Sequence, residues 1–414
     1  MQPLLLLKQT LEAGYDPGPL RLDGPNVEFT AAEQLFSKLG PSKSARRTEL
    51  GIGLEVGNRS LISRFRRVRP RSRQTTIELV EMTTRVGDEI STLSPKMKEK
   101  EILDQLPSQT SRWYQSFLTP SGENGFGFRI FRNRSFLEVG LDEEDVFEAA
   151  LVPSVSLSGV FDPVIRSIIH IPGLRGNPER LYPVTAVGDS FPGQFQTYVA
   201  SIIARWENDG DERRINALGD DLKALGLTWR VRAVPVSDTQ VEIQVGRLPT
   251  AGQGGAWDLV NIADVGFGVS QWLPVLVALH AARAGQTIYI EQPEIHLHPR
   301  AQFNMGAILA RAVRRGVRLV IETHSDLLVL GIQTLVARDE LEPDQVMLHW
   351  FARRADGVTE ITTAEVDETG SFGEWPEDFG DVNLRAQDQY LEAAEDKLAA
   401  NPDLAEDAVG ADEG

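Results

Sequence analysis

The most regular hydrophobic pattern in the chain lies between residues 258 and 330. Two runs there, Gln286–Ile290 and Val317–Ile321, are apolar at nearly every position, which is typical of strands buried on both faces of a parallel sheet. Roughly 30 residues separate them, the length of a helix and a strand in a βαβ unit. The pattern therefore predicts an α/β fold.

Elsewhere the chain alternates between strand-like and helix-like patterns. Apolar and polar residues alternate over 20–22, 27–29, 50–56, 75–82, 126–138, 229–234 and 240–245, which predicts strands, and the last two flank a hairpin turn at 235–238. Helical spacing predicts helices over 3–13, 94–118, 193–207 and 212–224, with another beginning near Glu143. A compact apolar strand, 166–171, leads into Pro172–Arg180, a loop rich in turn formers and arginine.

These patterns divide the chain into five segments. We expect the first part of an α/β domain at 1–60, an inserted lid at 61–150, the core of the domain at 151–355, a C-terminal extension at 356–400 and a disordered acidic tail at 401–414. The last 34 residues, 381–414, hold ten acidic side chains against Arg385 and Lys397.

Composition narrows the function classes. The 414 residues include no cysteine, which excludes disulfides, thiolate zinc sites and cysteine nucleophiles. No apolar run approaches the roughly 20 residues of a membrane helix, so we expect a cytoplasmic protein without membrane contact. The net charge of −18 disfavours non-specific nucleic-acid binding. Arg64–Arg73 is the basic exception; it is either a nucleic-acid contact or a solvated or acid-paired face, and the second is favoured because no aromatic stacking platform accompanies it.

The first segment with recognisable chemistry is Thr287–Pro299, in which a buried strand ends at Glu291. Ligands of open α/β sheets bind where the strands end. A carboxylate there can hold Mg²⁺ through water, because this cation prefers oxygen ligands and keeps several waters. Glu291 is therefore the candidate Walker B acid and metal ligand. The alternative, a strand that merely ends in a solvated acid, is disfavoured by the Gln-Pro-Glu and Leu-His-Pro sequences that follow.

Two further segments place candidate phosphate-binding groups next to a predicted strand or helix. In Leu319–Asp326 a second strand is followed by His324, which can hydrogen-bond a terminal phosphate or the attacking water; the alternative is a satisfied histidine in a polar turn. In Asp264–Gln271 a glycine-rich turn precedes an apolar helix, with Pro274 expected in its first turn. Free N–H groups and the helix dipole make such a helix start an anion site, although a glycine turn that only caps a core helix is the simpler alternative.

In order and spacing the three segments resemble ABC-type ATPases of the AAA family, and more closely the bacterial overcoming-lysogeny-defect (OLD) and RecF/SMC-type ATPases. The phrases Ile-Glu-Gln-Pro-Glu-Ile-His-Leu-His-Pro and Glu-Thr-His-Ser-Asp carry the resemblance, which is most specific over 258–330. It implies a P-loop NTPase fold, namely an ABC-type ATPase head with a mixed sheet flanked by helices and a lid insertion.

The resemblance also implies roles for individual residues. Gly266, Gly268, Ser270 and Gln271 would form the nucleotide-contacting signature motif, Glu291 would be the Walker B acid, Leu297–Pro299 would lie in the D-loop, and His324 would be the H-loop histidine. The cofactors would be ATP and Mg²⁺. Two heads would form a homodimer around nucleotide, head to tail, and pass the change to DNA or to an effector protein in DNA repair or in defence against mobile elements.

The first departure from this family concerns the phosphate-binding loop. No G-x-x-x-x-G-K-[ST] sequence occurs in the 414 residues. In relatives an apolar helix like Pro3–Glu12 follows that loop at once, so we expect Met1 to lie just after it, in a chain truncated before Walker A. The alternative function is a truncated or pseudo-ATPase that acts as a non-enzymatic interaction subunit. In either case residues 1–414 alone should show no measurable ATP binding.

The second departure is Gln292. ABC-type enzymes usually place a glutamate directly after the Walker B acid, where it activates the attacking water, whereas an amide can only orient that water. We therefore expect Gln292 to take part in slow hydrolysis, with Glu294 or Glu322 as alternative participants.

Three remaining features are interpreted more simply. Arg175 and Arg180 either line the nucleotide edge or brace their own loop. The D-loop explains His296 and His298 better than a metal pair does. Only 88 residues follow Asp326, too few for the Toprim domain that nuclease members of the group append, so nuclease activity is not expected.

Overall fold

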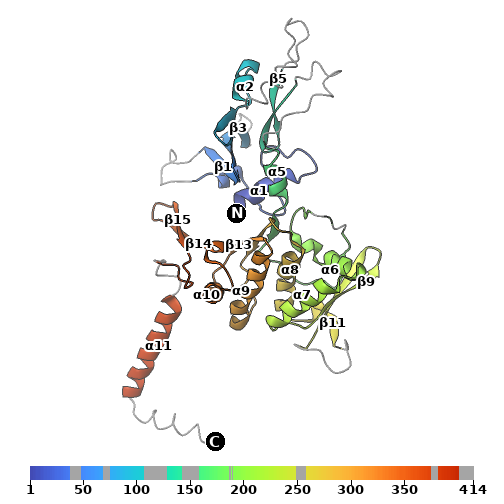
Figure 1. Ribbon diagram of the computed structural model, residues 1–414, viewed down its shortest axis with the longest axis vertical. Coiled ribbons are helices and arrows are strands. Elements are labelled where there is room, and N and C mark those ends of the chain that lie inside the picture. Colours follow the sequence, from blue (N-terminus) through green and yellow to red (C-terminus); the bar gives the residue numbers. More distant parts are fainter. Residues whose placement is uncertain are drawn as a thin grey trace, which may run out of the picture.

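A computed structural model describes residues 1–37, 48–68, 75–106, 128–141, 158–185, 188, 190–248, 258–373 and 381–400. In Figure 1 the antiparallel strands β1–β6 lie in the upper part of the molecule and the parallel strands with their helices in the lower part. Helix α11 (Asp381–Ala400) is exposed and projects away from both. The α/β class predicted from the sequence is confirmed.

The upper part is built around an antiparallel sheet in the order β1-β2-β3-β4. These strands are β1 (Glu49–Val56), β2 (Arg59–Val68), β3 (Thr76–Val86) and β4 (Glu89–Leu93). One hydrophobic core joins the sheet to five neighbours, which are β5 (Phe128–Asn133), β6 (Phe136–Leu141), α1 (Gln2–Leu11), α2 (Glu99–Gln105) and α5 (Phe161–Arg166). Since the sheet runs from 49 to 93, it includes residues on both sides of the expected division at 60 and 61. The division into segments stays a prediction.

Strand β2 shows how this sheet uses its arginines. Its residues alternate between the two faces, so Phe65 is fully buried while Arg64 and Arg66 are exposed. Arg64 pairs with Glu81 at 3.0 Å and Arg66 with Glu49 at 2.7 Å. This part of the basic run is thus an acid-paired face, and residues 69–73 of the run lie outside the described residues.

The lower part contains a parallel sheet in the order β13-β12-β7. Its strands are β7 (Ile169–Ile171), β12 (Thr287–Glu291) and β13 (Arg318–Glu322). The helices of this part are α6 (Val199–Asn208), α7 (Glu212–Ala224), α8 (Phe267–Ala281), α9 (Pro299–Arg314) and α10 (Asp326–Ala337). Helix α8 is apolar on nearly all sides and almost completely buried, and it forms the centre of the second core.

The remaining strands form two small antiparallel sheets. One contains β8 (Tyr182–Pro183), β9 (Val231–Ser237), β10 (Gln240–Gly246) and β11 (Leu259–Asn261). The other is the hairpin of β14 (Met347–Arg353) and β15 (Thr359–Glu365). Short 3-10 turns occur at Ala32–Leu35, Phe195–Tyr198, Ile262–Asp264 and Pro343–Gln345. In the described part of the chain no helix is both long and apolar enough to cross a bilayer.

Several predicted elements differ from those observed. The strand expected at 166–171 begins only at Ile169, because α5 includes Arg166. The expected hairpin turn at 235–238 lies later, with Pro235 inside β9. Among the described strands β9 pairs only with β10 and is therefore an edge strand, where a proline is tolerated. Instead of strands at 20–22 and 27–29 there is a single bridge between Asp23 and Glu28.

Two helix predictions concern residues that the structure does not describe, one in part and one entirely. Of the helix expected at 94–118, α2 forms at Glu99–Gln105, and 107–127 is not described. The helix expected near Glu143 lies wholly outside the described residues, as does the tail at 401–414.

Burial of the second parallel strand also differs from expectation. Residues 317–321 were expected to be covered on both faces, yet β13 alternates between exposed and half-buried positions and Val320 is 39 % exposed. The reason is that, within the described part of the chain, β13 is the edge strand of the sheet and pairs only with β12.

Candidate functional site

The candidate site is the edge of the parallel sheet where β7, β12 and β13 end. Strand β12 pairs with β13 in register, so that Glu291 lies opposite Glu322. On its other side Ile290 pairs with Ile171 of β7. Because the three strands run in the same direction, the loops that follow them leave the sheet at one edge. The expectation that the polar ends of the two apolar runs share one edge is confirmed.

Glu291, the predicted Walker B acid, has both carboxylate oxygens engaged. Its Oε1 lies 3.2 Å from His170 Nε2, and its Oε2 accepts a hydrogen bond from the Gly173 N–H at 3.0 Å. The hydrogen bond with His170, helped by the Gly173 N–H, holds the pKa of Glu291 below its ordinary value against the opposing effect of burial. Glu291 is therefore ionised at neutral pH, as a ligand for a divalent cation has to be.

The sequence patterns do not single out His170, although it occupies the centre of β7. Its side chain is 1 % exposed, and its Nδ1 lies 3.1 Å from Asn26 Oδ1. The imidazole also stacks on Tyr289 of the neighbouring strand, with ring centroids 5.5 Å apart. The available signal was a lone polar residue within the apolar run Ile168–Ile171. Its contact with Glu291 depends on the pairing of β7 with β12, which no local pattern indicates.

The second acidic strand end, Glu322, is held by Tyr289. The Tyr289 hydroxyl donates to Glu322 Oε2 at 2.8 Å. Burial, together with this hydrogen bond to a carboxylate, raises the pKa of Tyr289 far above its ordinary value, so the hydroxyl remains a donor at neutral pH. The hydrogen bond orients the Glu322 carboxylate within the edge, and the participation of Glu322 in hydrolysis stays a prediction.

Gln292 has an unusual backbone conformation. Its φ is +43°, in the left-handed region that residues with a side chain enter at a cost of about 1–2 kcal/mol. Its N–H donates to the Glu322 carbonyl at 2.7 Å. Its Oε1 lies over Gly173, where an added Cβ would be 3.4 Å away. Backbone strain of this kind is common at active sites and ligand-binding positions. The role of Gln292 in orienting water stays a prediction.

Glu294 joins the loops that follow β12 and β13. Its Oε1 accepts a hydrogen bond from the His324 N–H at 2.7 Å, and its Oε2 accepts one from the Thr323 hydroxyl at 2.9 Å. His324 itself is exposed, so its imidazole faces solvent at the edge. Both interpretations of His324, the phosphate contact and the polar turn, are compatible with this position.

The predicted signature motif forms the first turns of α8 rather than a loop before it. Gly266 is the N-cap and Phe267 begins the helix. Pro274, which was expected in the first turn, therefore lies in the helix interior, because the helix starts earlier than the glycines suggested. An added Cβ on Gly266 would meet nothing within 4 Å, so there is open space at the N-terminus of the helix. Gly268, in contrast, packs against the Leu227 side chain.

Two side chains of α8 attach this helix to the strand-end loops. Gln271 is 4 % exposed, and its amide donates to the Gly176 carbonyl at 2.8 Å. Trp272 Nε1 donates to the Pro293 carbonyl at 2.6 Å. The Ser270 hydroxyl bonds within its own helix. Both Gln271 and Ser270 thus have intramolecular partners, and contact of the signature residues with nucleotide stays a prediction.

The loop after β7 holds the two arginines whose role the sequence left undecided. Arg180 is exposed and pairs with Asp264 at 2.6 and 3.2 Å, which braces the loop against the segment before α8. Arg175 is buried, and its Nη2 donates to the Glu291 carbonyl at 2.9 Å. Within the described part of the chain, its Nε and Nη1 have no hydrogen-bond partner. Arg175 thus belongs to the strand-end edge, and Arg180 is a surface brace.

The edge offers donors for phosphate and a carboxylate for a cation. The unpartnered N–H groups of Arg175 and the open helix start at Gly266 suit an anion, and Glu291 suits Mg²⁺ that is held partly through water. Among the described residues no group of three or more His, Asp or Glu side chains is arranged to hold a metal. His296 and His298 have separate surroundings, since the first stacks on an aromatic ring of α8 and the second caps α9.

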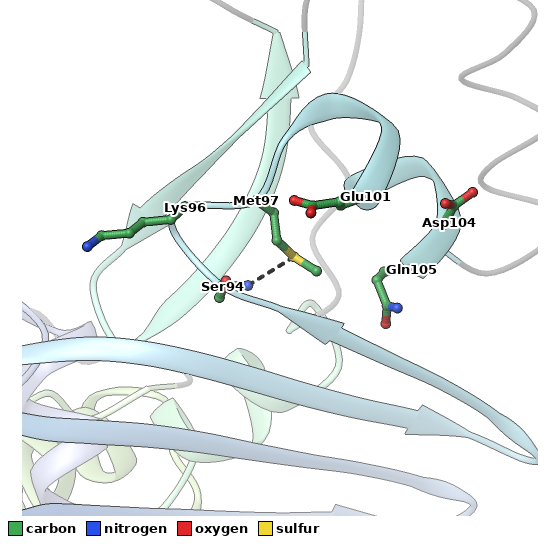
Figure 2. A pocket seen from close by; sticks show the side chains of 6 residues that line it. All are labelled: Ser94, Lys96, Met97, Glu101, Asp104 and Gln105. Carbon is green, nitrogen blue, oxygen red and sulfur yellow. Dashed lines mark hydrogen bonds between the residues drawn. The ribbon is translucent and has the colours of Figure 1, made fainter.

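Two cavities lie away from this edge. One, of about 430 Å³, lies beside α2; Figure 2 shows the residues that line it, which are Ser94, Lys96, Met97, Glu101, Asp104 and Gln105. Glu101 and Gln105 accept hydrogen bonds from nearby backbone N–H groups. The other cavity, of about 890 Å³, lies at the ends of α8 and α9, where Asp221 is bound by His280 and Arg311. None of the predicted site residues lines either cavity.

Residues 115–330, which are 216 of the 414, match the model of a family described as "AAA domain, putative AbiEii toxin, Type IV TA system". A search of curated proteins found no match. Similar solved structures include the Smc head bound to the C-winged helix domain of ScpA, at 10 % identity over 75 % of this chain and 76 % of that chain, with a TM-score of 0.32. The SMC head domain from Thermotoga maritima gives 9 % identity, the same coverages and a TM-score of 0.30. TM-scores this low do not establish a common fold.

Proposed function

This chain belongs to the AAA-domain family whose model matches residues 115–330, and from that premise we propose that it binds and hydrolyses ATP as one head of a nucleotide-bridged homodimer. The observation that carries the proposal is the register of the parallel sheet. It brings Glu291, the loop after β13 and the loop after β7 to one edge. Such an edge is where open α/β sheets bind their ligands.

Each residue at this edge has a proposed part. Glu291, kept ionised by His170 and the Gly173 N–H, would hold Mg²⁺. Gln292 would orient the attacking water, and His324 would contact the terminal phosphate. When bound, Mg²⁺ offsets the negative charge of the phosphates.

The N-terminus of α8 has a part that involves the second head. Gly266, Gly268, Ser270 and Gln271 would present the first turn of the helix to the nucleotide of the partner head. The open space at Gly266 supports this, because free N–H groups and the helix dipole attract an anion there. A dimer would then form only with nucleotide between the heads, and hydrolysis would release it.

This function requires a phosphate-binding loop from outside residues 1–414, since no G-x-x-x-x-G-K-[ST] sequence occurs among them. The test compares two forms, residues 1–414 and the same chain extended through the codons that precede Met1 in frame. We expect ATP hydrolysis only from the extended form, with loss of hydrolysis in its Glu291→Gln variant. An extended form that carries a Gly-Lys-Ser/Thr loop but neither binds nor hydrolyses ATP would show that the proposal is wrong.

The missing loop also favours a second candidate, a non-enzymatic interaction subunit. An in-frame stop codon directly before Met1, without such a loop in reach, would put this candidate first. For either candidate we propose that the head acts as a switch on DNA or on an effector protein, in DNA repair or in defence against mobile elements. The name of the family, which refers to a toxin–antitoxin system, is compatible with the defence role.

A further inference from the structure

Arg175 is a buried arginine with unused hydrogen-bonding capacity. Its side chain is only 7 % exposed, and one of its nitrogens, Nη2, is bonded to the Glu291 carbonyl. In the described part of the chain, Nε and Nη1 have neither a protein partner nor contact with solvent. Burial lowers the pKa of Arg175 to about 10, although the charges of Glu294 and Glu291 oppose this. The guanidinium therefore stays charged at neutral pH.

A buried charge with unpaired N–H groups is unfavourable, because those groups have lost water and gained no acceptor. Native proteins keep such groups where a ligand completes them or where strain serves a function. Neither of the nearby carboxylates accepts from Nε or Nη1, since Glu294 is bonded to the loop after β13 and Glu291 to His170 and Gly173. Among the described residues, an acceptor is therefore missing beside Nε and Nη1.

That place adjoins the end of β12, which holds this head's nucleotide in the proposed function, and it is linked to α8, which contacts the partner head's nucleotide. Arg175 and the Gly173 N–H bind the end of β12, and Gln271 of α8 binds the carbonyl of Gly176. The loop that carries Arg175 reaches the surface, because Leu174 is 86 % exposed. An added Cβ on Gly176, whose φ is +70°, would meet nothing within 4 Å. Nε and Nη1 are shielded from solvent, so an anion at the edge would reach them only if this loop shifted.

We propose that Arg175 is an oxyanion ligand that binds the terminal phosphate of a nucleoside triphosphate through an N–H group of Nε or Nη1, which the described fold leaves unpaired. A guanidinium suits this, since it is charged at neutral pH and each of its N–H groups can donate to a phosphate oxygen. The identity of the anion rests on the proposed function, whereas the presence of an anion site rests on Arg175 alone. Because the Gln271 amide of α8 donates to the Gly176 carbonyl in the same loop, phosphate binding at Arg175 would also affect the position of α8.

Arg180 provides a matched control in the same loop. It has the same side chain, but it is exposed and its guanidinium is already paired with Asp264. Replacing either arginine by methionine removes one charge and keeps most of the side-chain length. A difference between the two variants therefore reports the surroundings of Arg175 and not the net charge of the loop.

The experiment measures the melting temperature of residues 1–414 against the concentration of sodium tripolyphosphate, with sodium chloride at equal ionic strength as the reference. We expect tripolyphosphate to stabilise the wild type and Arg180→Met alike. Arg175→Met should need at least a tenfold higher concentration for the same shift, and without ligand it should melt no lower than the wild type, because no unpaired charge is buried. Arg175→Lys should fall between the two.

Equal responses of Arg175→Met and Arg180→Met would overturn the proposal. The proposal would also be overturned if tripolyphosphate did not stabilise the wild type and Arg175→Met melted at a lower temperature. Arg175 would then be a structural brace. If Arg175→Met does not fold, Arg175→Lys decides, and a wild-type response from it overturns the proposal. A further outcome is that tripolyphosphate stabilises the chain through Arg175 while the extended form has no ATPase activity. That result would support the anion site but refute the proposed function.

Discussion

The antiparallel sheet β1–β4 and the parallel sheet β7–β12–β13 both bury apolar side chains, but they use the ends of their strands differently. In the antiparallel sheet, tight turns at Gly57 and Gly87 join β1 to β2 and β3 to β4. In the parallel sheet each strand needs a crossover, so three separate loops leave one edge. The second arrangement brings polar strand ends from distant parts of the chain to a single edge.

The same residue type accordingly behaves differently in the two sheets. Glu81 and Glu49 of the antiparallel sheet pair with exposed arginines, where water and salt weaken the attraction. Glu291 of the parallel sheet is bound by a buried histidine and a backbone N–H. Exposure and topology, and not residue type, thus separate a surface carboxylate from a candidate ligand.

The largest effects should come from the two cores. Trp272→Ala and Phe65→Ala each remove a fully buried aromatic side chain, one from each core. We expect each to lower the free energy of unfolding by about 3–5 kcal/mol, because a cavity adds to the lost burial. Urea unfolding followed by circular dichroism measures both changes.

Milder substitutions at the same two positions sharpen the comparison. In the extended, ATP-hydrolysing form, Trp272→Phe removes the hydrogen bond to the Pro293 carbonyl and should slow hydrolysis. Phe65→Leu should leave the rate unchanged. If both variants changed the rate equally, the separation of the chemistry from the antiparallel sheet would be wrong.

The next effect concerns Gln292. A carboxylate at this position can accept a proton, which an amide cannot, and general-base catalysis contributes on the order of 10²-fold or more. We expect Gln292→Glu to raise the ATPase rate of the extended form toward that factor, measured as phosphate release at saturating ATP. An unchanged or lower rate would mean that Gln292 does not limit hydrolysis.

A smaller effect follows from the pKa of Glu291, which is lower in the folded chain than its ordinary value of 4.5. A depressed carboxyl pKa contributes stability that is fully present above the unfolded pKa and is lost as the pH falls through the folded pKa. We expect the wild type to be more stable than Glu291→Gln by about 1 kcal/mol at pH 7. The difference in urea midpoint should shrink below pH 4.5, and a difference that grew toward acid would contradict the assignment.

The smallest effect should be found at the exposed pair of the antiparallel sheet. Both Arg64 and Glu81 are more than one-third exposed, so their attraction is largely screened. We expect Glu81→Gln to change the free energy of unfolding by less than about 0.5 kcal/mol at physiological salt. A loss as large as that of Glu291→Gln would remove the contrast between the two carboxylates.

The sequence predicted those parts of the site that depend on short segments. Two apolar runs indicate strands, one followed by Glu291 and the other ending shortly before His324. The roughly 30 residues between the two runs indicate a parallel pair. The glycines before α8 indicate a helix start, although the helix begins early enough to place Pro274 in its interior. These features arise from neighbouring residues, and neighbouring residues can be compared in a sequence.

The sequence did not predict the contacts that join distant segments. His170 binds Glu291 across 121 positions, and Asn26 binds His170 across 144. The burial of Arg175 and the exposure of Arg180 are opposite outcomes for one residue type in one loop. They depend on which loop lies over which strand end, and this follows from packing that no local pattern encodes.

The most direct test of the account is the molar mass of the extended form with and without Mg²⁺-ATP, measured by size-exclusion chromatography with light scattering. We predict a monomer without nucleotide, a dimer with ATP, and a weakened dimer when Glu291 is replaced by glutamine, since Glu291 is the proposed ligand of Mg²⁺ at the strand-end edge. A mass that is the same with and without ATP, in an extended form shown to carry a phosphate-binding loop, would contradict it.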